Sequence, residues 1–211
     1  MCAGRTDAGV HALGQVVSAD VPDGSDPAAL TSALNAMLGP SLAITECTAA
    51  ADDFHARFSA RSRTYAYAIL TAPVHDPWLA RTSLHHPSPL DLAAMNEAAG
   101  HLVGRHDFRS FGRVSEPDAP AERVLFELSC RRSGSLIRIR ARANAFIHQM
   151  VRSLTGLLIQ VGARKRSPDE VPGVLAARDR ARAGPVAPPH GLCLVSVEYD
   201  DGWSRPFDPL R

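Results

Sequence analysis

The chain has 211 residues, of which 45% are hydrophobic and 21% charged, and its formal net charge is +1. This balance is typical of a globular protein with one large or two small domains, and no apolar run reaches the roughly 18 residues of a membrane span. The four cysteines stand far apart, without the paired spacing of a zinc site. We therefore expect reduced thiols, no metal, no membrane association and a cytoplasmic protein without a signal peptide.

The first dozen residues contain a loop in which two glycines bracket a carboxylate, Asp7. Gly4 and Gly9 permit positive φ angles and the close approach of a ligand or of another backbone segment, as catalytic loops often require. The alternative is a surface turn with a capping aspartate, because glycine and aspartate are ordinary turn residues. A phosphate-binding loop is excluded, because Val10 and His11 stand where the Walker pattern needs Lys and Ser/Thr.

The segment after this loop predicts a strand, a helix and a second short strand, over 10–19, 26–38 and 42–47. Asp26 is suited to cap the helix, with Pro27 in its first turn, and Gly39 ends it. Helical apolar spacing also predicts that one face of this helix packs against the core. The residues of that face are Leu30, Leu34, Met37 and Leu38.

The segment 52–70 combines arginines with aromatic residues. Its second half alternates, so that Tyr65 and Tyr67 share one face of an expected strand, and the arginine-rich first half ends at Arg63. Arginines interleaved with aromatics suit a phosphate backbone and stacked bases. The alternative is a strand with a solvated basic edge, which is common in natural sheets.

The middle of the chain predicts connections around one helix. Residues 71–89 are rich in proline and histidine and are expected to form a loop, and an amphipathic helix is expected over 91–102. The pair His106-Asp107 stands near no nucleophile pattern, which disfavours a catalytic triad. Residues 115–121 are polar, contain proline and predict a loop.

Positive charge is concentrated in residues 123–182, which hold 13 basic and 4 acidic side chains. Strands over 123–131 and 136–143 are expected to form an antiparallel hairpin. Alternation along the second strand places three arginines on one face, namely Arg138, Arg140 and Arg142. Such a surplus is typical of proteins with a polyanionic partner, but the row either meets RNA or is a solvated surface, and both interpretations remain open.

Residues 144–161 predict the main core helix from their apolar spacing. Arg152 stands among apolar positions of this helix, and a buried arginine is costly unless it is paired. We expect Asp7 to be its partner, within about 4 Å. The alternative is an Arg152 side chain that reaches solvent. The last expected elements are a helix over 167–182 and a strand over 191–199.

Four blocks of the sequence resemble the tRNA pseudouridine synthases of the TruA type, in the order in which that family carries them. The longest is Gly4-Arg-Thr-Asp-Ala-Gly-Val-His-Ala12. The others lie near residues 53–67, with Arg63-Thr-Tyr-Ala-Tyr67 at the end, near 143–156 and near 191–199.

The resemblance implies isomerisation of uridine to pseudouridine in the tRNA anticodon stem-loop, at positions 38–40, without a cofactor. Asp7 would be the catalytic residue, acting as nucleophile or base at the sugar, with active-site support from Arg5, Arg152 and Leu192. Substrate binding is implied for Tyr65, Arg63 and His11. Two other classes remain open: a non-catalytic RNA-binding module, and a nucleoside or glycoside hydrolase that uses Asp7 with a histidine.

The family also implies an α+β fold, the pseudouridine synthase fold. It has a mixed, mainly antiparallel sheet, with helices on one face and a basic RNA-binding cleft on the other. Because the family's N-terminal strand and helix do not precede the loop in this sequence, we expect residues 1–56 to be the remainder of an N-terminal subdomain and 57–211 the C-terminal one. A homodimer whose cleft uses both subunits is a further expectation.

Overall fold

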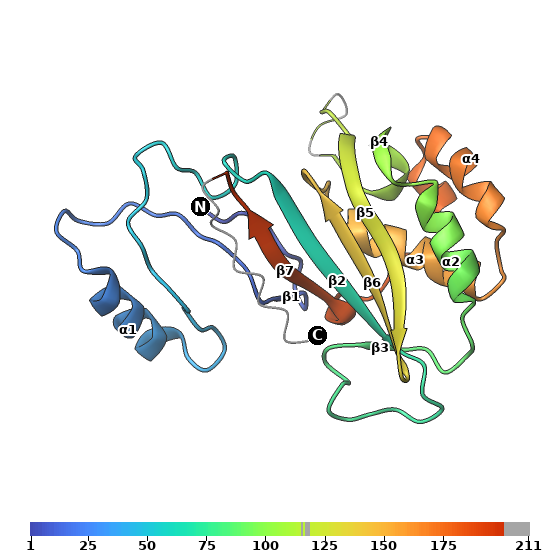
Figure 1. Cartoon of the computed structure of the whole chain (residues 1–211), viewed down its shortest axis with the longest axis horizontal. Coiled ribbons are helices and arrows are strands. Elements are labelled where there is room, and N and C mark those ends of the chain that lie inside the picture. Colours follow the sequence, from blue (N-terminus) through green and yellow to red (C-terminus); the bar gives the residue numbers. More distant parts are fainter. Residues whose placement is uncertain (115, 117–118, 201–211) are drawn as a thin grey trace.

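The computed structural model describes residues 1–114, 116 and 119–200, and one seven-stranded sheet forms its centre. The strands follow the order β1-β7-β2-β6-β5-β4, and β3 pairs with β2 outside that path. All pairings are antiparallel except β1 with β7 and β2 with β3. The expected α+β class with a mainly antiparallel sheet is therefore confirmed (Figure 1). The strands are β1 (His11–Ala12), β2 (Ser62–Leu70), β3 (Leu84–His85), β4 (Gly104–Asp107), β5 (Glu122–Ser133), β6 (Leu136–Ala143) and β7 (Leu192–Glu198).

The helices divide into a group behind the sheet and one that stands apart (Figure 1). Helix α3 lies behind β5 and β6, α2 lies beside β5 and α4 lies beyond them, whereas α1 lies at the far end of the molecule. None of the helices in the described ranges is long and apolar enough to cross a membrane. The helices are α1 (Pro27–Leu38), α2 (Leu92–Gly100), α3 (Met150–Gly162) and α4 (Val171–Ala176), with 3₁₀ turns η1 (Arg109–Phe111), η2 (Pro168–Glu170), η3 (Arg180–Ala183) and η4 (Pro189–Gly191).

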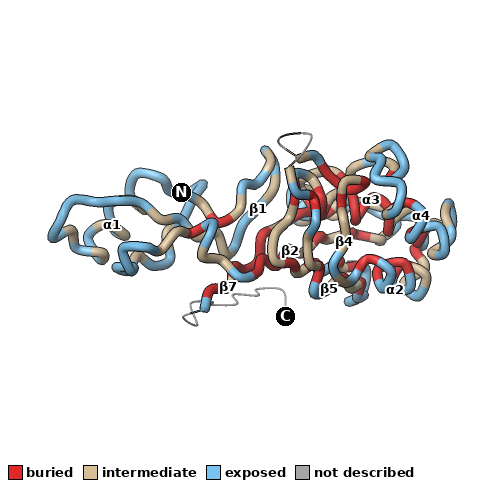
Figure 2. Tube along the Cα trace, turned by 90° about the horizontal axis from the view of Figure 1, so that it is seen from above, coloured by how far each residue is buried: buried red, intermediate tan, exposed pale blue. Residues whose placement is uncertain are grey.

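One face of the sheet carries the core, because side chains alternate along each strand. In β6 the apolar set from Ile137 to Ala143 is buried, and Tyr65 of β2 lies opposite Ala141 in the register on that same side. Helix α3 contributes Leu154 and other fully buried residues to this core. Figure 2 shows the buried residues gathered in the sheet and in the helices that cover it. The expected hairpin and the expected strand near the C-terminal end of the described chain are both confirmed.

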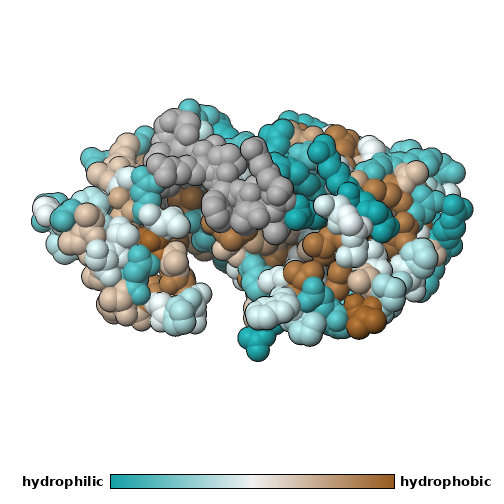
Figure 3. Space-filling model, turned by 60° about the horizontal axis from the view of Figure 1, so that its bottom comes forward, coloured by the Kyte–Doolittle hydropathy of each residue, from teal (hydrophilic) through white to brown (hydrophobic). Residues whose placement is uncertain are grey.

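Helix α1 begins as expected but does not pack as expected. The Asp26 side chain caps it by accepting hydrogen bonds from the backbone amides of Ala28 and Ala29, with Pro27 as its first residue. None of its residues is buried, and Met37 is 78% exposed, so the expected contact of its apolar face with the core is wrong. The apolar surface of this part of the molecule shows as tan and brown atoms at the left of Figure 3.

One of the two strands expected near α1 is shorter than predicted and the other is absent from the described part of the chain. Of residues 10–19 only β1 is a strand, and residues 42–47 form none. The segment 42–47 is instead held by Asn35, whose side-chain amide donates to the Ile44 carbonyl and accepts from the Ile44 amide. The side chain thereby replaces the backbone partner that a strand would have needed.

Helix α3 begins six residues later than its apolar spacing predicts. The Asn144 side chain accepts hydrogen bonds from the backbone amides of Val124 and Ala145, which holds the chain in a turn after β6. Gln149 then has a φ of 64°, in the left-handed region, which a right-handed helix cannot contain. The helix therefore starts only at Met150.

The helix expected over 167–182 is broken into η2, α4 and η3. Arg178 has a φ of 51°, which ends the helical path, and the Asp179 side chain then caps η3 by accepting from the Ala181 amide. The sequence pattern of polar and apolar residues does not reveal such a single left-handed residue. The polar loop expected over 115–121 lies partly outside the described residues.

The close contact between α3 and the segment 185–188 gives a test of the fold. A Cβ atom added at Gly156 would lie 2.0 Å from the carbonyl oxygen of Pro185, so a Gly156→Ala variant must displace this segment. Overpacking typically costs about 1–3 kcal/mol, and for a chain of this size that lowers Tm by roughly 2–12 °C. Thermal unfolding followed by circular dichroism measures the change.

Gly173→Ala in α4 is the matched control. A Cβ atom at Gly173 meets nothing within 4 Å, and alanine favours a helix over glycine by roughly 0.5–1 kcal/mol. We expect this variant to keep or raise Tm. An equal loss of Tm in both variants would contradict the steric explanation.

Candidate active site

The loop around Asp7 is held close to the sheet by its neighbours. The Gln15 side chain accepts from the Gly4 amide and donates to the Gly4 carbonyl, at 3.3 and 2.6 Å. A Cβ atom at Gly4 would lie 3.1 Å from the Tyr65 hydroxyl, and Gly9 has a φ of 83°. The first glycine therefore allows a close approach and the second allows the turn, as their positions in the sequence predict.

The Asp7 carboxylate accepts two hydrogen bonds from one short segment of the chain. Arg152 Nη1 lies 2.5 Å from Asp7 Oδ2, and His148 Nε2 lies 3.0 Å from Asp7 Oδ1. The expected Arg152–Asp7 contact within about 4 Å is confirmed, and the solvent-directed alternative for Arg152 is wrong. Arg152 also donates from Nε to the Ala187 carbonyl at 2.8 Å, so the guanidinium is fixed at two points.

The electrostatics of this pair follow from its burial. The Arg152 side chain is 13% exposed and the Asp7 side chain 24%, so both charges lie mostly away from water. A charge in such a position is tolerated when a partner of opposite sign and additional hydrogen bonds are present. The arrangement holds the Asp7 carboxylate in place, where it can act as a nucleophile or a base.

The sequence interpretation missed His148. Its side chain is 52% exposed, at the outer side of Asp7, whereas Arg152 lies at the inner side. The sequence offered one indication, because His148 and Arg152 are four residues apart and residues i and i+4 share a face of a helix. His148 does not lie in that helix, however, because the left-handed Gln149 precedes the first helical residue.

Tyr65 lies beside the loop on the core face of the sheet. Its ring packs edge-on against Phe146, with 5.2 Å between the centroids. Burial raises the pKa of Tyr65 to about 12, and the charge on Asp7 acts in the same direction. Its hydroxyl is therefore protonated near neutral pH and acts as a hydrogen-bond donor rather than as a base.

Leu192 is buried at the start of β7, where it lies opposite Tyr67 in the register. Tyr67 donates from its hydroxyl to the Pro188 carbonyl at 2.8 Å, and a Cβ atom at Gly191 would lie 2.6 Å from the Tyr67 ring. The segment that binds Arg152 through Ala187 is thus fixed to the sheet by Tyr67. Leu192 therefore lies next to the strand residue that holds this segment.

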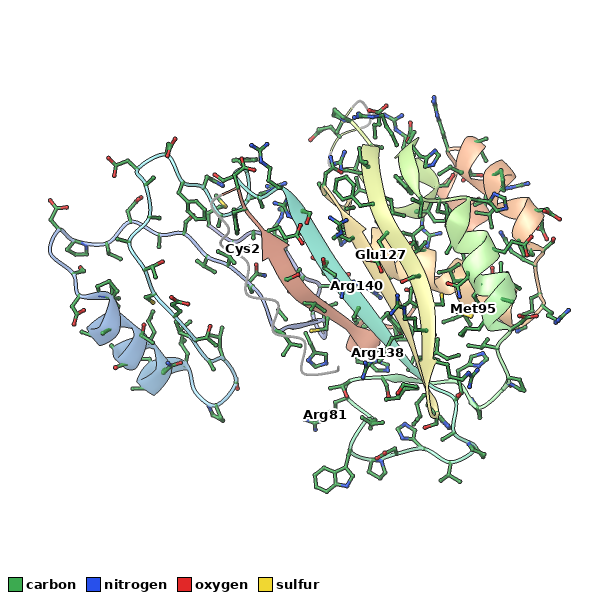
Figure 4. The ribbon with its side chains drawn as sticks, viewed as in Figure 1. Cys2, Arg81, Met95, Glu127, Arg138 and Arg140 are labelled. Atoms are coloured by element: carbon green, nitrogen blue, oxygen red, sulfur yellow. The ribbon has the colours of Figure 1, made fainter. Side chains whose placement is uncertain are left out.

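The structure does not bring Arg63, His11 and Arg5 to the Asp7 carboxylate. Arg63 is 8% exposed and donates to the carbonyls of four residues, namely Ala3, Arg57, Ala60 and Asn144. The His11 ring contacts the Arg81 carbonyl at 2.7 Å, and Arg81 is labelled below the sheet in Figure 4. The Arg5 side chain is exposed, and no other described residue forms a hydrogen bond or an ion pair with it.

The arginine row of β6 lies on the face of the sheet that is turned away from α3 (Figure 4). Arg140 pairs with Glu127 at 3.2 Å, and Arg142 pairs with Glu198 at 3.7 Å. Asp7 lies on the opposite side, against α3. The arginine row and the Asp7 pair therefore lie on different faces of the sheet, and carboxylates partly neutralise the row.

The described residues contain no group of three or more His, Cys, Asp or Glu side chains that could hold a metal ion. The groups that surround Asp7 are two donors, Arg152 and His148, and the protonated Tyr65 hydroxyl nearby. These residues suit chemistry at a single carboxylate.

Comparison with known proteins agrees with this geometry. A family model described as tRNA pseudouridine synthase matches residues 98–200. The tRNA pseudouridine synthase A of Xanthomonas euvesicatoria pv. vesicatoria (strain 85-10) is 42% identical over 208 residues, which cover 99% of this chain and 81% of the relative. The protein of the same name from Moorella thermoacetica (strain ATCC 39073 / JCM 9320) is 43% identical over 203 residues, covering 94% of this chain and 81% of the relative.

The matched region covers 99% of the chain and so spans both the loop that carries Asp7 and the segment that carries its two donors. A third relative, tRNA pseudouridine synthase A of Pseudoalteromonas translucida (strain TAC 125), is 41% identical over 210 residues, covering 100% of this chain and 80% of the relative. The chain belongs to the tRNA pseudouridine synthase family.

Proposed function

We propose that this chain isomerises uridine to pseudouridine in the anticodon stem-loop of tRNA, at positions 38–40, with Asp7 as the catalytic carboxylate. The observation that carries the proposal is the ion pair of Asp7 and Arg152 in a loop with the family's motif. The relatives' names support tRNA as substrate and the isomerisation as reaction.

The reaction suits a site with one carboxylate. The bond between C1′ and N1 of uridine breaks, the uracil turns, and a bond between C1′ and C5 forms, so no atom is gained or lost. A glycosidase needs a second carboxyl group to protonate a leaving group or activate water, whereas here the base is retained. Asp7, paired with Arg152, would act at the sugar as nucleophile or base.

The target uridine must leave the stack to reach Asp7, at a cost of a few kcal/mol. Tyr65 would support the flipped base with its ring, and Leu192 would support it from below. The exposed Arg5 would fill the vacated space or bind a phosphate. Arg63 would act indirectly, because its guanidinium ties the first loop to the strand ends through the Ala3 and Asn144 carbonyls.

Three further expectations stay proposals: a homodimer whose cleft uses both subunits, a division of the chain into 1–56 and 57–211, and a cytoplasmic location. The division is supported by the separate position of α1 (Figure 1).

A second candidate function, hydrolysis of a nucleoside, is favoured by one observation, the contact of His148 with Asp7. Free uracil and incorporation of solvent oxygen distinguish that reaction from isomerisation.

An Asp7→Asn variant tests the role of the carboxylate. The substitution keeps the size of the side chain and removes its charge, so kcat for pseudouridine formation should fall by at least about 10²–10⁴-fold, the range of a lost catalytic acid or base. Affinity for tRNA should survive, because phosphate contacts dominate it. Pseudouridine mapping of the anticodon arm and a filter-binding assay measure the two quantities.

Asp23→Asn in the exposed loop before α1 is the matched control and should keep the wild-type rate. Continued turnover by the Asp7→Asn variant would contradict the assignment. Release of free uracil by the wild type would favour the hydrolase.

Arg152→Met tests the pairing itself. Removal of one partner of a largely buried ion pair is strongly destabilising, by about 3–5 kcal/mol, because the other charge stays behind. The double variant Asp7→Asn with Arg152→Met should therefore be more stable than Arg152→Met alone, as non-additive effects of contacting residues require. Urea unfolding measures this free energy, and strict additivity of the two changes would contradict the pair.

Tyr65→Phe tests the protonation state of the hydroxyl. A tyrosine with a pKa of about 12 keeps its proton throughout the neutral range, so loss of the hydroxyl should leave the shape of the pH–rate profile unchanged up to about pH 9. Tyr65→Leu, which removes the ring as well, should lower the rate further than Tyr65→Phe. If the change in rate at high pH disappeared in Tyr65→Phe, the role of the hydroxyl as a proton donor in hydrogen bonds would be contradicted.

A further inference from the structure

Two donors to Asp7 come from one stretch of five residues, but they differ in character. Arg152 binds Oδ2 from the inner side and is 13% exposed, whereas His148 binds Oδ1 from the outer side and is 52% exposed. An arginine remains charged at every pH that a protein survives. A histidine changes its charge between about pH 5 and 8.

The backbone of His148 is held in place by three features. The left-handed conformation of Gln149, with a φ of 64°, turns the chain between His148 and helix α3. The Arg113 amide donates to the His148 carbonyl at 3.0 Å, in an isolated antiparallel bridge. A Cβ atom at Gly112 would lie 2.6 Å from the same carbonyl oxygen, so only glycine allows this approach.

A left-handed residue other than glycine is uncommon, and such conformations cluster at functional sites. Here the conformation has a direct consequence: it lets His148 and Arg152 reach the two oxygens of one carboxylate. With both oxygens bound, the carboxylate plane of Asp7 is fixed. A reacting group held in one orientation reacts faster than a mobile one.

We infer that His148 is a positioning residue for Asp7, which orients the carboxylate through Oδ1 and makes the reaction depend on pH. The inference rests on the proposed isomerase function. A carboxylate oxygen only accepts, so the contact requires a hydrogen on His148 Nε2. The neutral imidazole with its proton on Nε2 satisfies this, and so does the imidazolium.

The direction of the pH effect follows from the charges around the pair. The groups that face His148 are Asp7 from the first loop, Arg152 from α3 and the segment of Arg113, whose side chain is exposed. A protonated His148 places a second positive charge beside Asp7, which makes the carboxylate a weaker nucleophile or base. The rate should therefore fall when His148 gains its second ring proton at low pH.

The test compares His148→Gln and His148→Leu with the wild type, by kcat and KM for pseudouridine formation between about pH 5 and 9. Glutamine places an amide nitrogen near the position of Nε2, so it keeps the donor and cannot titrate. We expect His148→Gln to keep most of the activity and to lose the decline at low pH. His148→Leu should lower kcat by roughly tenfold or more with KM nearly unchanged, because the misplaced group is the reacting one.

His101→Gln is the control, since His101 is exposed at the end of α2 and should keep the wild-type profile. Gly112→Ala is a second probe, because its Cβ atom would collide with the His148 carbonyl oxygen and with the Ile147 side chain and so displace the backbone of His148. It should lower kcat as His148→Leu does, with a fold verified by circular dichroism.

Two results overturn the inference alone: wild-type kcat in His148→Leu, or an unchanged low-pH decline in His148→Gln. A wild-type protein that binds tRNA and forms no pseudouridine would instead overturn the proposed function. The two failures are therefore distinguishable.

Discussion

The ion pair of Asp7 and Arg152 is the interaction on which the rest of the site depends. It joins a loop at the start of the chain to the first turn of α3, 145 residues later. An arginine among the apolar residues of α3 would be costly without that carboxylate, and the carboxylate would not stay oriented without the arginine. Each residue thus explains the position of the other.

Several contacts that look structural serve this pair. The Ala187 carbonyl holds the second edge of the Arg152 guanidinium, and Tyr67 fixes the same segment through Pro188. Gly156 allows that segment to approach α3. The buried Arg63 ties the start of the chain to the strand ends through backbone carbonyls. The site is therefore supported by backbone groups from four separated parts of the sequence.

The sequence predicted the elements that depend on local periodicity. The hairpin of β5 and β6, the alternation of β2 and the Asp26 cap of α1 were all correct, because each follows from spacing or from one side chain. The Arg152–Asp7 pair was also predictable, because a charge in an apolar helix demands a partner. These inferences need no knowledge of distant backbone.

The failures share one cause, which is dependence on backbone that only the fold brings together. Single left-handed residues, Gln149 and Arg178, decided where two helices begin or end, and one of them hid His148. The sequence predicted that Arg63 binds the substrate, but its guanidinium donates hydrogen bonds to backbone carbonyls that lie far apart in the sequence. Apolar spacing in α1 predicted a contact face and carried no information on whether anything covers it.

The position of α1 has a consequence for how the chain unfolds. The arm between Ser18 and Ala56 is joined at its base, where the Ala56 amide donates to the Ser18 hydroxyl at 3.1 Å, and its helix buries no residue. Amides in α1 should exchange with deuterium through local opening, long before those of α3. Heat should melt the arm before the sheet, so the calorimetric enthalpy of the chain will exceed the van't Hoff value of its main transition.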